Sequence, residues 1–299
     1  MSYVLLLLAT LSWSFVGILV KMASGMADSW LITFARFFLG VVFLGVYLLV
    51  KDRGISLRSA LPWIWIGAIG KSLNYLFENI AIAIGYAYAD ILVQPAQTIT
   101  LLLAARFMLG ERMTPRGWIA SALCVVGVLI VGWNGMPIGL LLGGGALTTL
   151  LFTLAGIGAA VHILSQRVLV RTIDAGNLNF SVFLWSAVLC ALPLPFRSEG
   201  LSGEWTAGAW IALVLLGVIT GLSFLWFAEA IKKVPFAIVA IVGNCSVLFT
   251  ILWAYLFFRE PITWIVILGT VVFVAGFLLL NFAVPRRETK QESAGELTA

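Results

Sequence analysis

One stretch of this sequence occurs twice, and the second copy strongly limits what the chain can fold into. The segment from Ala81 to Gly132 returns, changed but in register, from Ala230 to Leu280, so that Glu111 falls on Glu260. Each copy belongs to a half with five apolar spans. An odd number of spans makes the second half enter a membrane upside down relative to the first. Inverted repeats of this kind are typical of transporters.

The composition excludes an ordinary water-soluble domain. Hydrophobic residues make up 62% of the chain and charged residues only 10%, and the mean hydropathy is +1.09. A soluble fold cannot hide that much apolar surface. We therefore expect an all-α integral membrane protein with the lipid bilayer as its surroundings.

Ten apolar segments are long enough to cross a bilayer, because a helix needs roughly 17 to 25 apolar residues for about 30 Å of hydrocarbon. The sequence thus predicts ten transmembrane helices in two inverted-topology five-helix repeats. The predicted spans are 3 to 24, 29 to 50, 61 to 84, 87 to 108, 115 to 133, 146 to 170, 177 to 195, 207 to 231, 235 to 258 and 262 to 282.

The domain organisation follows from these spans. Residues 1–133 form the first repeat, 134–145 a linker, 146–283 the second repeat, and 284–299 a polar tail that we expect to be disordered. With the N-terminus inside, 13 of the 18 basic residues fall in cytoplasmic segments and three in outer segments. This bias predicts a cytoplasmic location for both termini. It also explains the net charge of +5 without nucleic acid as a partner.

Several motifs together resemble those of a known family. Leu109-Gly110-Glu111 follows the fourth span, Phe258-Arg259-Glu260 follows the ninth, and the fifth and tenth spans are rich in glycine. With ten spans in two halves, the chain from residue 1 to about 283 resembles the drug/metabolite transporter superfamily, specifically its EamA-type exporters. The resemblance implies export of small metabolites, often amino acids, across the cytoplasmic (inner) membrane of a bacterium. It does not identify the substrate, because these motifs belong to the scaffold.

Lys71 is the leading candidate for a substrate-binding residue. It lies about ten residues into the third span, hence roughly 15 Å deep and near the midplane, where inverted-repeat transporters place substrate. Trp13 and Asn244 reach a similar level in spans 1 and 9. A lysine at that depth costs on the order of 2.5 to 3.5 kcal/mol. It should therefore face a cavity or a partner.

The residues around Lys71 support this placement. Lys71, Asn74, Tyr75 and Glu78 recur at helical spacing and predict one polar stripe. In the functional interpretation Lys71 meets a substrate carboxylate or titrates as a buried amine. A structural ion pair, or a lysine head that snorkels towards water, explains the residue equally well.

A second layer of charge is predicted nearer the outer surface. Arg36, Glu78 and Asp90 each lie roughly 5 to 10 Å below the outer end of a span, so Arg36 is expected to pair with either acid. The pair is either a gate that breaks and re-forms or a permanent brace.

Span 4 contains a further candidate element. Gln94 is followed by Pro95, and a proline inside a helix removes one hydrogen bond. The repeat offset places Pro95 on Asn244, so both halves are interrupted at the same level. We expect Gln94 to line the pathway and Pro95 to act as a hinge.

His162 is the only histidine in the chain, and the repeat aligns it with Trp13. An imidazole here is expected either to bind substrate or relay protons, or to be a satisfied core residue. Neither the cysteines nor this histidine have metal-ligand spacing, so no cofactor, metal site or catalytic residue is expected.

The sequence leaves three classes of function to compare. Export of amino acids, with aromatic ones among them, by alternating access around a midplane cavity fits best. A multidrug exporter of lipophilic compounds is the alternative, although spans 1 and 6 lack a carboxylate and a basic midplane residue favours anionic or zwitterionic cargo. An intramembrane enzyme is disfavoured because no hydrolytic constellation is present. The fold predicts a monomer and leaves a dimer open.

Overall fold

The computed structural model describes residues 2–108, 115–133, 145–169, 172–196, 203–231, 246 and 249–283. These residues fold into helices and connecting turns, and no β-strand occurs among them. The first half of the chain contributes α1 (Ser2–Ser14), α2 (Val16–Ala23), α3 (Ser29–Asp52), α4 (Pro62–Ile84), the 3₁₀-helix η1 (Ala87–Leu92), α5 (Val93–Met108) and α6 (Pro115–Trp133).

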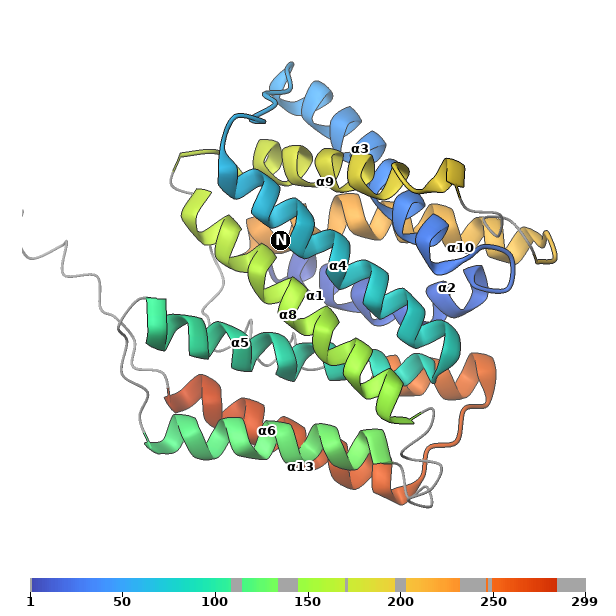
Figure 1. The fold of residues 1–299 in the computed structure, drawn as a ribbon, viewed down its shortest axis with the longest axis vertical. Helices are drawn as coiled ribbons and strands as arrows, with labels where there is room; N and C mark the ends of the chain where they lie inside the picture. Colours follow the sequence, from blue (N-terminus) through green and yellow to red (C-terminus); the bar gives the residue numbers. More distant parts are fainter. Residues whose placement is uncertain are drawn as a thin grey trace, which may run out of the picture.

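The second half contributes a similar series of helices (Figure 1). They are α8 (Ala146–Leu169), α9 (Ala175–Ala191), the short η3 (Leu194–Phe196), α10 (Ala207–Val218), the π-helix η4 (Ile219–Ser223), α11 (Phe224–Ile231) and α13 (Trp264–Ala283). Residues 249–258 are also helical.

Five helical stretches are long and apolar enough to cross a membrane: Ser2–Ala23, Ser29–Lys51, Ala146–Gln166, Ala175–Phe196 and Ala207–Phe227. Shorter apolar helices accompany them in the described residues. The protein is therefore an all-helical, multi-pass membrane protein. The full set of ten spans and the inverted arrangement of the two halves stay predictions.

Local sequence explains where several helices begin. The Asp28 carboxylate accepts a hydrogen bond from the Leu31 backbone N–H at 2.7 Å and so caps α3. Thr206 caps α10 in the same way. Pro62 occupies the first position of α4, where the missing N–H has no helical partner in any case.

The predicted span 3 to 24 is not one continuous helix. It breaks at Phe15, between α1 and α2. The break is held from the other end of the chain, because the Trp253 indole N–H donates to the Ser14 hydroxyl at 3.0 Å and the Phe15 ring stacks on Trp253. The predicted span 207 to 231 is also interrupted, by the π-helix η4.

Close backbone approach brings α4 against α8. A Cβ atom added at Gly158 would lie 2.6 Å from the Gly70 carbonyl oxygen, so the two helices contact each other through their backbones. This contact places the residues that follow Gly70 directly beside the second half of the chain. At the lower edge of the molecule in Figure 1, α6 and α13 run side by side.

Candidate functional site

One face of α4 carries a row of buried polar side chains. Lys71, Asn74, Tyr75 and Glu78 are all buried, with exposures of 6% or less. Their spacing places them on the side of α4 that faces α3 and α8. The predicted polar stripe is thus an interior row and not a surface one.

Lys71 makes one hydrogen bond to a neutral group. Its Nζ donates to the Asn74 side-chain oxygen at 2.8 Å. The same ammonium lies 4.1 Å from the centre of the Tyr75 ring and 5.0 Å from that of Phe224. Among the described residues, no carboxylate forms a direct ion pair with Lys71. The ammonium is therefore solvated mainly by aromatic rings and one amide, which leaves donor capacity for an anion.

Asn74 fixes the position of Lys71 relative to both halves. Its side-chain nitrogen donates to the Glu78 carboxylate at 3.3 Å and to the Ala155 carbonyl in α8 at 3.1 Å. One side chain thus links the two charged residues of α4 to the second half of the chain.

Aromatic rings from three other helices surround Phe224, one of the two rings near the Lys71 ammonium. Phe224, the first residue of α11, lies 5.4 Å from Trp13, 5.5 Å from Phe183 and 6.4 Å from His162, measured between ring centres. The predicted residues Trp13 and His162 therefore meet in one cluster, although they contact Phe224 and not Lys71 in the contacts described. Such rings suit an apolar or aromatic cargo side chain.

His162 is buried at 1% exposure, and neither of its ring nitrogens has a hydrogen-bond partner of good geometry in the described residues. The backbone of Gly67 lies beside the ring. A buried imidazole with unpaired nitrogens is uncommon in a packed core. Substrate binding or proton relay by His162 stays a prediction, as does the alternative of a satisfied core residue.

The predicted partner of Arg36 is Glu78. An Arg36 side-chain nitrogen donates to the Glu78 carboxylate at 2.9 Å and to the Asn79 side-chain oxygen at 2.8 Å. Asn79 in turn donates to the Thr33 hydroxyl at 2.8 Å. Arg36 is 1% exposed and its guanidinium covers the Tyr75 ring at 3.5 Å. This ion pair therefore adjoins the Lys71 site through Tyr75.

Asp90 lies on η1, close enough to interact electrostatically with Arg36, Glu78 and Lys71. The three predicted residues of the outer layer are thus brought together, with Glu78 as the direct partner of Arg36. Whether they act as a gate remains a prediction.

The structure changes the physical basis of the predicted hinge. Pro95 falls in the first turn of α5, directly after η1. The chain changes from 3₁₀ to α geometry at Val93, before the proline. Gln94 is the second residue of α5 and is exposed. Asn244 lies outside the described residues.

An ionic cluster that the sequence reasoning missed joins the two halves. Both oxygens of the Glu260 carboxylate accept from the Ala87 N–H at 2.9 Å, and Glu260 lies 3.4 Å from the Lys21 ammonium. Lys21 also donates to the Gly85 carbonyl. We call Lys21, Glu260, Gly85 and Ala87 the clasp. The Glu motif was predicted to be structural, and its repeat partner Glu111 lies outside the described residues.

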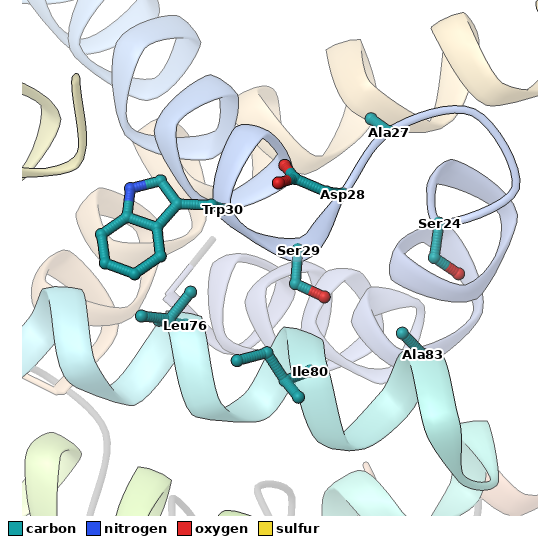
Figure 2. Close-up of a pocket in the computed structure, with 8 residues that line it drawn as sticks. All are labelled: Ser24, Ala27, Asp28, Ser29, Trp30, Leu76, Ile80 and Ala83. Carbon is teal, nitrogen blue, oxygen red and sulfur yellow. The ribbon is translucent and has the colours of Figure 1, made fainter. Parts of the chain in front are cut away.

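A pocket of about 400 Å³ lies on another face of α4. It runs between the connection of α2 to α3 and the second half of α4, with Trp30 and Leu76 towards one end and Ser24 and Ala83 towards the other (Figure 2). Leu76, Ile80 and Ala83 lie about half a helical turn away from the Lys71 row. The pocket is therefore separate from the aromatic cluster. Its lining is Ser24, Ala27, Asp28, Ser29, Trp30, Leu76, Ile80 and Ala83.

Phe183, Phe224 and Asn79 are further members of the site that the sequence did not single out. Phenylalanine is frequent in this chain, with 20 residues, so no pattern distinguishes the two that meet the site. Asn79 directly follows Glu78, and an amide within an apolar span is a usable signal because it needs a buried partner.

Comparison with known proteins gives a consistent result. The model of the "EamA-like transporter family" matches this chain twice, over residues 1–133 and 146–282. Two curated relatives, each named "Pseudopaline exporter CntI", come from Pseudomonas aeruginosa strains PAO1 and UCBPP-PA14. Each is 26% identical over 287 residues, which cover 93% of this chain and 94% of the relative.

The fold is also similar to a solved one. A structure titled "Crystal structure of protein" superposes with a TM-score of 0.69 and 18% identity. The match covers 95% of this chain and 98% of the other. At that identity the likeness concerns the fold alone.

Proposed function

The chain belongs to the EamA-like transporter family, and we propose that it exports small metabolites bearing a carboxylate, most concretely amino acids, with aromatic ones included. In this proposal the cargo carboxylate binds the Lys71 ammonium. An apolar or aromatic side chain of the cargo lies among Trp13, Phe183 and Phe224.

One observation carries the proposal. Lys71 is buried beside Tyr75 and Phe224, its ammonium donates to the neutral Asn74 amide, and no carboxylate among the described residues forms a direct ion pair with it. The acid nearest in the row, Glu78, already receives hydrogen bonds from Arg36 and Asn74. An anionic cargo group would supply the missing partner, and burial would strengthen that attraction relative to water.

The position of the site supports alternating access. Lys71, Asn74 and Tyr75 come from the first half, whereas His162, Phe183 and Phe224 come from the second. A movement of one half against the other would open and close such a site. In the proposed cycle, the cargo enters from the cytoplasm and leaves after the layer of Arg36, Glu78 and Asp90 separates. Pro95 and the changed helix geometry before it remain the proposed hinge, with Gln94 and Asn244 as proposed lining.

The cellular setting is part of the proposal. The distribution of Lys and Arg supports an inner-membrane location with both termini cytoplasmic. Two five-span halves within one chain would form a complete transport unit as a monomer.

Two other cargo classes are weighed against amino acids. The names of the relatives make pseudopaline a second candidate. Export of lipophilic cations is the third, but a buried ammonium at the site would repel them.

The test is uptake into proteoliposomes that contain the purified protein. Labelled neutral amino acids, pseudopaline and a lipophilic cation are compared for wild type, Lys71→Ala and Lys51→Ala, with and without an imposed pH gradient. Lys51 is an exposed lysine at the end of α3 and serves as the matched control.

We expect carboxylate-bearing cargo to be taken up by wild type and Lys51→Ala and to be lost in Lys71→Ala. Uptake of pseudopaline but of no amino acid would replace the amino-acid proposal and keep the role of Lys71. Uptake of the cation alone would overturn both. Dependence on the pH gradient would separate proton coupling from facilitated diffusion.

A further inference from the structure

The π-helix η4 (Ile219–Ser223) ends where the aromatic cluster begins. Phe224 follows it directly and is the ring of the second half that approaches the Lys71 ammonium, at 5.0 Å. Short π-helical turns are rare and occur frequently at functional sites. The direction in which the Phe224 side chain leaves the helix therefore depends on the backbone geometry of the five residues before it.

We propose that Phe224 is a movable lid over the Lys71 ammonium, carried by η4, and that it leaves this position before a cargo carboxylate binds. This rests on the proposed function in taking Lys71 as the carboxylate site. The lid makes Phe224 a specificity-determining residue, because only cargo that can displace the ring or pack against it reaches the charge.

The contacts of Phe224 fit a lid. Lys71 is 6% exposed, and Tyr75 and Phe224 are the two rings described near its ammonium. Tyr75 is fixed between Arg36 and the stacked ring of Phe37. Phe224 is only partly buried and makes edge contacts with its neighbouring rings. Of the two rings, Phe224 is thus the freer to move.

The polar groups of η4 indicate a second conformation. The hydroxyls of Thr220 and Ser223 are on fully buried residues, yet neither has a hydrogen-bond partner among the described residues. In the α-helices of the same chain, Thr33, Thr100 and Thr270 donate to the carbonyl four residues earlier. In η4 the Thr220 and Ser223 hydroxyls thus lack the hydrogen bond to a preceding backbone carbonyl that threonine and serine commonly form in an α-helix.

Moving the π turn would also move the ring. Successive residues of an α-helix are rotated by about 100° around its axis. If the wide turn shifted past Phe224 towards α11, residues 220–223 would take α geometry and the Phe224 ring would turn away from Lys71 by about that angle. One shift therefore satisfies the two hydroxyls and uncovers the ammonium.

The packing against α3 would permit such a shift. A Cβ at Gly221 would lie 2.8 Å from the Gly40 carbonyl oxygen, and one at Gly40 would lie 3.0 Å from the Thr220 side chain. Backbones meet here without large side chains between them. Small residues at this contact let the two backbones approach closely, so a shift of the π turn would move no large side chain of Gly40 or Gly221.

The test measures access to position 71 and needs no cargo. In a background with Cys124, Cys190 and Cys245 changed to alanine, Lys71→Cys is introduced. Its labelling by an anionic methanethiosulfonate reagent is then followed by mass spectrometry in proteoliposomes. Three further variants of this Lys71→Cys protein are then compared with it. The first carries Phe224→Ala, the second carries Phe224→Leu, and the third carries both Thr220→Val and Ser223→Ala.

Two variants serve as controls. Phe38→Ala removes a ring of α3 that is 51% exposed. Thr270→Val removes a buried hydroxyl that is already bonded in an α-helix. We expect neither to change the labelling rate.

We expect Phe224→Ala to raise the labelling rate about tenfold, the factor that corresponds to loss of the stronger aromatic contacts, and Phe224→Leu to raise it less. Thr220→Val with Ser223→Ala should slow labelling, because the open geometry loses its hydroxyl bonds. Equal labelling rates for the protein with Phe224 and for its Phe224→Ala and Phe224→Leu variants would overturn the proposed lid. An unchanged rate in the hydroxyl double variant would overturn the role of η4.

Because labelling requires no transported molecule, failure of the cargo panel would not affect this result. Conversely, a labelling rate that did not respond to the Phe224 substitutions would show that the lid proposal is wrong, even if uptake of amino acids had been demonstrated.

Discussion

The clasp, which is partly buried, and the Lys71 site, which is fully buried, both carry charge and are built from the two halves of the chain, but they differ in how completely their polar atoms are paired. In the clasp, both Glu260 oxygens accept the Ala87 N–H, and Lys21 has a carboxylate and a carbonyl as partners. At the other site, the Lys71 ammonium has no carboxylate as a direct partner among the described residues, and neither ring nitrogen of His162 has a hydrogen-bond partner of good geometry there.

This difference separates a brace from a binding site. A buried polar network whose atoms are all paired rigidifies the fold, whereas unpaired buried groups are costly unless another molecule or state pairs them. The Arg36–Glu78 pair lies between these cases. Its ion pair is formed, yet the Arg36 Nε has no partner in the described part of the chain. Substitutions in the clasp and in the Arg36–Glu78 pair should therefore act mainly on stability, whereas substitution of Lys71 should act mainly on transport.

Breaking the Arg36–Glu78 pair should cost the most stability. Arg36→Ala leaves the Glu78 charge buried without its cation, which typically costs about 3 to 5 kcal/mol. The free energy of unfolding in detergent, measured by denaturant titration against wild type, gives the number. Arg58→Ala removes an exposed arginine and should change little. A loss below about 1 kcal/mol for Arg36→Ala would mean that the pair behaves as a surface one.

Opening the clasp should cost less. Glu260→Ala removes the acceptor for the Ala87 N–H and leaves Lys21 its carbonyl partner, so we expect a loss of about 1 to 3 kcal/mol. Glu260→Gln keeps one acceptor oxygen and should lose only part of that. The exposed Glu204 provides the control, Glu204→Ala, in the same unfolding assay. Transport by Glu260→Gln should stay close to that of wild type if the clasp is a brace; strong loss of transport from a stable variant would make it a gate.

Sequence periodicity and composition predicted the elements of this comparison that depend on hydrophobicity. The apolar spans, the buried row on α4 and the meeting of Arg36 with Glu78 all follow from helical spacing and the cost of charge in lipid. These features are local, or depend on a charge that must find an opposite charge. The family assignment also followed from the sequence motifs and agrees with the family match.

What the sequence did not predict depends on exact helix geometry. The breaks at Phe15 and at Ile219–Ser223 have no proline, so neither carries the strongest sequence signal of an interrupted helix. Phe224, which lies 5.0 Å from the Lys71 ammonium, directly follows this π turn. The clasp joins residues 173 positions apart through a backbone N–H. Every residue except proline has this group, so the sequence does not indicate which one binds a carboxylate.

Asp174 extends the comparison to a fully paired acid outside the membrane spans. Burial alone would raise its pKa, but hydrogen bonds from the Asn177 backbone and side chain and from the Gly176 backbone outweigh this and lower the pKa below 3.8. Asp174→Ala removes the cap of α9 and should cost about 1 kcal/mol in the unfolding assay.

The pH dependence of the Asp174 cap has a definite sign. Because the folded pKa is lowered, the unfolded chain binds the proton more tightly. The contribution is therefore fully present above the ordinary pKa of 3.8 and is lost as pH falls through the lower folded value. The difference in stability between wild type and Asp174→Ala should shrink on acidification in that range. A difference that stayed constant down to pH 3 would contradict the hydrogen-bonded cap.

The smallest effect on stability should come from the site with the strongest effect on transport. Lys71→Met keeps the approximate length and packing of the side chain while it removes a buried charge that has no carboxylate as a direct partner among the described residues. Replacing a poorly paired buried charge by an apolar side chain of similar volume is commonly neutral or stabilising, so we expect the unfolding free energy to stay within about 1 kcal/mol of wild type or to rise. Uptake of carboxylate-bearing cargo should nevertheless be lost. A large loss of stability in Lys71→Met would instead show that Lys71 is a structural cation, like Lys21 in the clasp. Incomplete pairing of buried polar groups would then no longer distinguish a binding site from a brace in this protein.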